Sequence, residues 1–196
     1  MANTNKPEGL APVSHVLGIP WNMGVHIYFI ASDDTNAFAI GDPVKSSGSG
    51  DDNGVPGVTL GTAGSPLRGA IVGFGTKESL MADPANLDSN IIPATKTKNY
   101  YCMVADDPFI IFEVQEIGTG TPLAKTEIGL NANLIAGANN GYVSGWLLNN
   151  SGENTTATLN VRLLGLARKS DNAFGAYAKW LVMINSHELK AGSDGI

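Results

Sequence analysis

The sequence predicts an all-β protein: a single β-sandwich, jelly-roll-like domain preceded by an extended N-terminal arm. Glycine occurs 24 times in 196 residues with no collagen-like period, which indicates many turns. Between these turns lie about nine or ten short apolar runs, and no alternation of strands with long helices interrupts them. A single sandwich or barrel is the economical arrangement for such a chain, and the jelly roll is its common form.

Residues 1–24 form the predicted arm. Pro7, Pro12 and Pro20 argue against both a regular helix and a central strand. The segment is nevertheless too apolar to remain solvated, so we expect it to lie along a neighbouring subunit. The alternative is an N-terminal strand packed on its own domain. The predicted interface residues are Leu10, Val13, Val16, Leu17 and Trp21.

The domain itself is predicted to span residues 25–189, with a C-terminal tail at 190–196. We expect strands where apolar, β-branched and aromatic residues lie between glycine, proline and aspartate turn signals. The clearest alternation places Leu159, Val161 and Leu163 on one face. The predicted strands are residues 25–30, 37–40, 55–60, 69–74, 100–104, 109–114, 130–135, 142–148, 156–164 and 177–184.

Loops and turns separate these strands. The Ser/Gly-rich residues 46–54 are predicted to be an exposed loop, and the pair Asn140-Gly141 favours a tight hairpin. Residues 83–89 and 121–127 each place a proline at the first position of a short helical turn. Neither segment is long enough to form a core helix.

Composition narrows the class of function. The net charge of −6 and the scattered Lys and Arg residues argue against nucleic-acid binding. No run approaches 18 apolar residues, and the first residues lack the apolar segment of a signal peptide, so we expect no membrane span and synthesis in a cytoplasm. Cys102 is the only cysteine; it is expected to be buried and cannot form an intrachain disulfide.

The motifs of common enzymes are missing. The sequence contains neither a nucleophile elbow nor a phosphate-binding loop. His15, His26 and His187 are isolated in sequence and lack the spacing of zinc ligands. We therefore expect no catalysis, no metal and no cofactor.

The acidic residues have ordinary explanations. Asp51-Asp52 lacks the alternating ligands of a calcium loop and is predicted to be solvated. Asp106-Asp107 precedes a proline, which favours a turn over a pair of catalytic carboxylates. Glu113 and Glu116 flank an apolar strand and are predicted to be rim charges.

Five collinear stretches carry a resemblance to a known family: residues 35–44, 53–56, 80–88, 105–116 and 178–182. Together they resemble head proteins encoded beside the major capsid protein in podovirus-like tailed bacteriophages. The resemblance extends over roughly residues 1–189, and the last seven residues have no match to the pattern.

The resemblance implies a cement, or decoration, subunit on the outside of a virion shell. Such a subunit binds major capsid protein of the HK97 type, reinforces joints between capsomers, and associates with copies of itself as a dimer or trimer. Trp21, Trp146 and Trp180 are candidate anchors, with core packing as the favoured alternative for the last two. The alternative function is a β-sandwich module that binds carbohydrate or a host surface.

Overall fold

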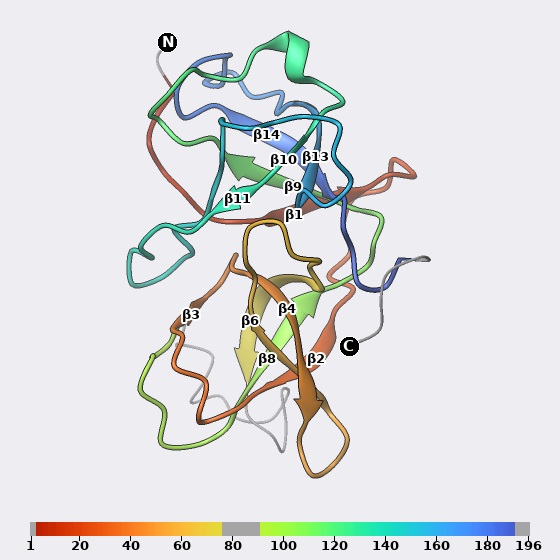
Figure 1. Ribbon diagram of the computed structural model, residues 1–196, viewed down its shortest axis with the longest axis vertical. Coiled ribbons are helices and arrows are strands. Elements are labelled where there is room, and N and C mark those ends of the chain that lie inside the picture. Colours follow the sequence, from red (N-terminus) through yellow and green to blue (C-terminus); the bar gives the residue numbers. More distant parts are fainter. Residues whose placement is uncertain (1–2, 76–90, 191–196) are drawn as a thin grey trace.

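The computed structural model describes residues 3–75 and 91–190, and nearly all of their regular secondary structure is β-strand (Figure 1). The predicted all-β, sandwich-like class is confirmed. A closed barrel, β2-β5-β4-β6-β8, lies against a five-stranded sheet, β1-β9-β14-β13-β10. In Figure 1 the barrel occupies the lower half of the molecule and the sheet the upper half. In the described residues no helix has the length and apolarity needed to cross a membrane.

The barrel is built from residues 26–105 around its own apolar core. Neighbouring strands are antiparallel except β2 and β5, which meet in parallel at Phe29 and Gly57. Ile30, Phe38, Ile71 and Cys102 lie in this core, so Cys102 is buried as predicted. The strands are β2 (His26–Ile30), β4 (Pro43–Gly50), β5 (Pro56–Leu60), β6 (Gly69–Gly75) and β8 (Tyr100–Ala105).

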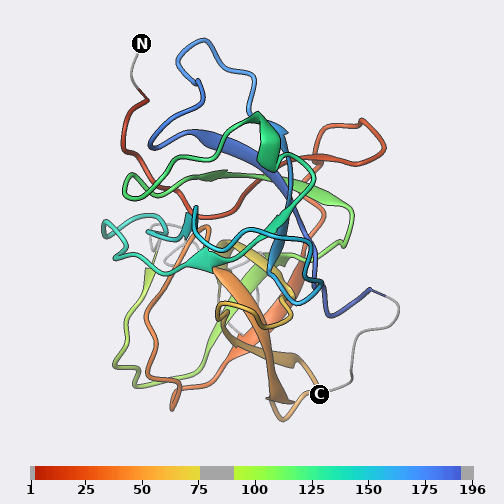
Figure 2. The ribbon, with the colours of Figure 1, turned by 45° about the horizontal axis from the view of Figure 1, so that its top comes forward.

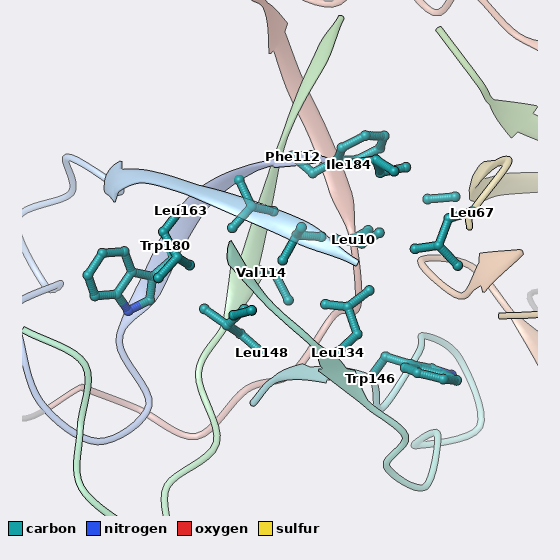
Figure 3. Close-up of a cluster of buried hydrophobic side chains, with 14 of the residues drawn as sticks. Leu10, Leu67, Phe112, Val114, Leu134, Trp146, Leu148, Leu163, Trp180 and Ile184 are labelled. Carbon is teal, nitrogen blue, oxygen red and sulfur yellow. The ribbon is translucent and has the colours of Figure 1, made fainter. Parts of the chain in front are cut away.

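The five-stranded sheet is antiparallel throughout and covers the second core. Along β14, Trp180, Val182 and Ile184 are buried while the residues between them are half-buried, because alternate side chains of a strand face opposite sides. The same core contains Trp146, so both Trp146 and Trp180 pack inside the protein (Figure 3). The strands are β1 (Ala11–His15), β9 (Ile110–Gln115), β10 (Asn131–Ala132), β13 (Val161–Leu166) and β14 (Lys179–Ile184).

Short elements complete the fold. β3 (Phe38–Ala39) pairs with β7 (Ile91–Ile92), and β11 (Leu134–Ile135) pairs with β12 (Leu147–Leu148). β11 and β12 are antiparallel, but the long connection of residues 136–146 joins them, so the tight hairpin predicted at Asn140-Gly141 is not formed. The second helical turn is the 3₁₀ helix η2 (Lys125–Glu127), which starts later than expected. The first, at 83–89, lies outside the described residues.

The prediction of an exposed loop at residues 46–54 was wrong for residues 46–50, which belong to a strand. β4 runs to Gly50 and pairs with β5 through Ser46–Val58 and Gly50–Pro56. The turn itself is confined to the residues after Gly50, where the Asp51 carboxylate accepts backbone hydrogen bonds from Asn53 and Val55. Small polar residues suit the solvent-exposed end of this strand, which is why they resemble a loop in sequence.

The N-terminal segment is not a free arm. Residues 11–15 form β1, the edge strand of the sheet, hydrogen-bonded to β9. Pro12 is tolerated in this strand because an edge strand is hydrogen-bonded on one side only, and proline has no backbone N–H to donate. Leu10 is fully buried in the core beneath the sheet, as Figure 3 shows. The prediction that Leu10 contacts another subunit was therefore wrong, and the alternative of a strand packed on its own domain describes residues 10–15.

Candidate functional site

A protruding hairpin follows β1, and both ribbon views show it extending from the side of the molecule (Figures 1 and 2). His15 N donates to Ile19 O at 2.9 Å, and Gly18 N donates to His15 O at 2.9 Å, closing a three-residue loop. Gly18 has a φ of 82°, the left-handed conformation that the last position of such a loop requires. We call residues 13–24 the finger.

Large apolar side chains cover the tip of the finger. Val16 and Leu17 occupy the two central turn positions, where short polar residues are usual, and are 51% and 86% exposed. Ile19 and Met23 are also exposed, and Met23 has a φ of 64°, which is unfavourable for a residue with a Cβ. Six of the thirteen exposed large apolar side chains in the described residues come from residues 13–27. Exposed apolar groups gathered in one place typically mark a binding surface.

The base of the finger, in contrast, is firmly held. Trp21 N donates to Val13 O at 3.3 Å, and its half-buried indole packs against the core of the sheet. Val16 N donates to Phe109 O at 3.0 Å, which fixes the finger to the turn before β9. The structure therefore separates the predicted interface residues. Leu10 is core, Trp21 supports the base, and Val13, Val16 and Leu17 are exposed together.

A polar cluster lies beside the finger. Asp106 Oδ1 is 2.8 Å from His26 Nδ1, and Asp106 Oδ2 accepts a 2.6 Å hydrogen bond from the Tyr28 hydroxyl. His15 Nδ1 approaches Asp107 Oδ2 at 3.5 Å. The predicted turn at residues 106–108 is present, with Ile110 N donating to Asp107 O. Asp106, however, is buried.

All three histidines of the chain gather around this turn. His187, although distant in sequence, is close enough to Asp106 and Asp107 for both carboxylates to favour its protonated form. Burial outweighs that attraction and lowers the pKa of His187 to about 4. Burial and the hydrogen bond to Asp106 raise the pKa of Tyr28. The histidines are isolated in sequence only; their proximity depends on pairings that no local motif encodes.

Between the finger and this cluster is a cavity of about 600 Å³. Leu17, Ile19 and Leu189 provide apolar lining, and His15, His26 and Asp107 provide polar lining. Leu189 is held there because the chain before it is anchored to the barrel. Leu67 N donates to Ser186 O, and Glu188 N donates back to Leu67 O.

An ion pair reinforces that anchor. Arg68 Nε lies 2.9 Å from Glu188 Oε2, and the same carboxylate accepts hydrogen bonds from the backbone N and hydroxyl of Ser46. Arg68 also lies over the ring of Tyr28, 5.7 Å from its centroid. The cavity wall is thus part of a rigid network.

The two glutamates predicted as rim charges are both buried. Glu113 is paired with Lys169 at 2.7 Å and Lys179 at 3.4 Å. Glu116 is fully buried and accepts hydrogen bonds from Leu123 N, the Asn150 amide and the Trp180 indole. Burial raises the pKa of Glu116, and these hydrogen bonds partly oppose the rise. Both carboxylates have structural roles.

In the part of the chain that the structure describes, no group of three or more His, Cys, Asp or Glu side chains is arranged to hold a metal ion. No family model matches the chain, and no curated protein or solved structure matches it either. The finger and its neighbouring cavity together form a mostly apolar contact surface, and hydrogen bonds hold the base of that surface in place.

Proposed function

We propose that this protein is a structural subunit of a tailed-phage head, a cement or decoration protein that binds the outside of a shell of major capsid protein. In this role it reinforces joints between capsomers and performs no catalysis. The observation that carries the proposal is the finger, whose apolar tip projects from a fixed base.

Burial of the finger's apolar tip against a partner would supply much of the binding free energy. Removing Leu17 from water on contact with a partner contributes about 1.5–3 kcal/mol, and Val16 and Ile19 add to this. Because the hairpin is already closed by backbone hydrogen bonds, little conformational entropy is lost on binding. A specific interface buries about 1,000 Å² or more in total. Phe109 and Leu189, both exposed and beside the finger, extend the surface toward that size.

The resemblance described above supports the choice of partner. Packaged DNA presses outward on a phage shell, and a protein that bridges two capsomers adds contact area that must separate before the capsomers do. An acidic protein also suits an outward-facing position, because it does not bind polyanions non-specifically.

A glycan-binding module is the competing proposal. Such a module presents exposed aromatic rings together on one face. In the described residues, the large exposed aromatic side chains are Phe109, Tyr142 and Phe174, which belong to three separate loops. Their separation favours the cement proposal.

Co-sedimentation with capsid shells that lack the protein tests the proposal. The unmodified protein should sediment with the shells at near-stoichiometric amounts, and Leu17→Asp should reduce this binding at least about tenfold. Tyr142→Asp is the matched control and should bind normally, because Tyr142 is likewise exposed, at 68%, but lies away from the finger. Failure of the unmodified protein to co-sediment would refute the proposal, and a glycan array would then test the alternative.

A further inference from the structure

A second cavity lies where the barrel meets the small β11–β12 pair. Its volume is about 680 Å³, and it shares no lining residue with the cavity beside the finger. A cavity of this size between two packed parts of a protein is a usual setting for a small-ligand site. We call it the junction cavity. The side chains that line it include Lys45, Leu60, Leu134, Ile135, Trp146 and Asn149.

Trp146 brings an unpaired hydrogen-bond donor to the junction cavity. It is only 7% exposed and lies next to Leu134 at the margin of the sheet core (Figure 3). Within residues 3–75 and 91–190 no group accepts a hydrogen bond from its indole N–H, yet that nitrogen is not sealed from solvent. The N–H of a buried tryptophan usually has a partner, as that of Trp180 has in Glu116. An acceptor for the Trp146 N–H would therefore lie in the junction cavity.

Two further donors line the same cavity. Lys45 is half-buried, and the one hydrogen bond of its ammonium in the described residues runs to the Thr62 hydroxyl at 3.4 Å. No carboxylate in that part of the chain pairs with it. Asn149 Oδ1 accepts from Ser151 N at 3.1 Å, whereas the Asn149 N–H₂ donates to no described residue. The free groups of Lys45, Trp146 and Asn149 are thus all donors.

The charge balance around the junction cavity is positive. Asp34 lies beside its wall, where the carboxylate accepts hydrogen bonds from the Thr59 hydroxyl at 2.7 Å and the Asn36 amide at 2.8 Å. The Lys96 ammonium donates to the backbone carbonyls of Asp34 and Asn36, so the charges of Asp34 and Lys96 offset each other. Lys45 remains as the excess positive charge at this site, in a protein whose net charge is −6.

We propose that the junction cavity binds a carboxylate attached to an apolar group. An ionised carboxylate is an acceptor only, with two oxygens and about four lone-pair sites, so it can accept from several of these donors at once. Its hydrogen bond to the Lys45 ammonium would be charge-assisted and therefore stronger than one between neutral groups. The apolar group would pack on Leu134 and Ile135. This binding site is independent of the finger and goes beyond the proposed function.

An NMR titration of the nitrogen-15-labelled full-length chain with hexanoate at neutral pH tests the proposal. The chain has three tryptophans, and Trp146→Phe identifies the indole N–H signal of Trp146. That signal should shift saturably, whereas the Trp180 signal should not, because its N–H is already paired with Glu116. Hexanamide has nearly the same shape without the charge and should bind at least about fivefold more weakly.

A pair of lysine variants tests the role of the charge. Lys45→Gln removes the ammonium and should weaken hexanoate binding at least about fivefold. Lys125→Gln is the matched control and should leave binding unchanged, because Lys125 is exposed in η2 and does not line the cavity. Circular dichroism confirms that each variant is folded, and this pair remains decisive if Trp146→Phe does not fold.

The carboxylate can belong to a free acid or to the C-terminus of another chain. A short peptide with an apolar last residue, tested with a free and with an amidated terminus, distinguishes these sources. Tighter binding of the free-terminus peptide than of hexanoate indicates a chain terminus, and the reverse order indicates a small acid; both support the proposal.

Three results would overturn it. They are no shift of the Trp146 signal with any of the carboxylates, equal binding of hexanoate and hexanamide, and unchanged hexanoate binding by Lys45→Gln. Leu17→Asp, which tests shell binding, should bind hexanoate normally, so failure of either proposal is distinguishable from failure of the other.

Discussion

The indole N–H of Trp180 donates to Oε2 of Glu116 at 2.9 Å, deep in the core of the five-stranded sheet. The other carboxylate oxygen accepts from Leu123 N at 2.9 Å and the Asn150 amide at 3.1 Å. One buried carboxylate thereby joins β14 to two loops. All three partners are donors, so this position requires a side chain with two acceptor oxygens.

Glu116→Gln should destabilise the protein by about 1–3 kcal/mol. Glutamine has the same shape, but its amide N–H₂ would face either the indole N–H or the other two donors, leaving at least one buried donor unpaired. Chemical denaturation monitored by tryptophan fluorescence measures the change in the free energy of unfolding. Asp52→Asn, an exposed carboxylate in the β4–β5 turn, is the control and should change it by less than about 0.5 kcal/mol. Equal stability of Glu116→Gln and the unmodified protein would show that these hydrogen bonds contribute little.

Glu116 also shows where sequence reasoning fails in this chain. The alternation of Leu159, Val161 and Leu163 predicts a half-buried strand, and Val161 and Leu163 are indeed buried in β13, because a strand's period is local. The burial of Glu116 depends on Trp180, 64 residues away, and that of Asp106 depends on Tyr28, 78 residues away. No pattern within a short window carries such pairings.

The sequence does not predict the finger, for a different reason. Its turn has Val16 and Leu17 at the central positions, and neither residue is a turn signal. Gly18 and Pro20 are the available turn signals, and in a segment rich in glycine and proline they indicate only irregular structure. Val13, Val16 and Leu17 are nevertheless predicted to be interface residues, because large apolar groups in a proline-rich segment need a partner. That reasoning describes their exposure correctly, but it does not hold for Leu10.

Gly18→Ala tests whether the shape of the finger matters for binding. Gly18 has a φ of 82° and Gly64 a φ of 73°, and a Cβ at either position would meet no atom within 4 Å. Each substitution should therefore destabilise its turn by only about 1–2 kcal/mol through backbone conformation. We expect Gly18→Ala to weaken shell binding several-fold in the co-sedimentation assay, and Gly64→Ala to leave it unchanged. Equal effects of the two variants would indicate that general stability, and not the finger, controls binding.

His187 should make the protein sensitive to mild acid. Its pKa is lowered from 6.5 to about 4 in the folded protein, so the unfolded chain binds the extra proton first as pH falls. The stability associated with the neutral ring is fully present above pH 6.5 and is lost progressively down to about pH 4. The loss amounts to at most about 3 kcal/mol. Urea unfolding at several values between pH 7 and 4 measures it.

His187→Gln separates this effect from the titration of carboxylates. The variant is less stable at pH 7 but should lose less stability on acidification than the unmodified protein. If both proteins lose the same amount between pH 6.5 and 5, where most carboxylates stay ionised, His187 is not the group responsible.

Leu10 and Leu17 are seven residues apart and should respond to alanine in opposite ways. Leu10→Ala removes buried methyl groups from the core under the sheet and should destabilise the protein by about 2–5 kcal/mol. Leu17→Ala changes a side chain that is 86% exposed and should alter the free energy of unfolding by less than about 0.5 kcal/mol. In shell binding the order should reverse: Leu17→Ala weakens it, whereas Leu10→Ala, measured where that variant is still folded, does not. These results would divide the N-terminal segment between the two leucines. Residues up to about the middle of β1 would stabilise the domain, and the finger would be available to a partner.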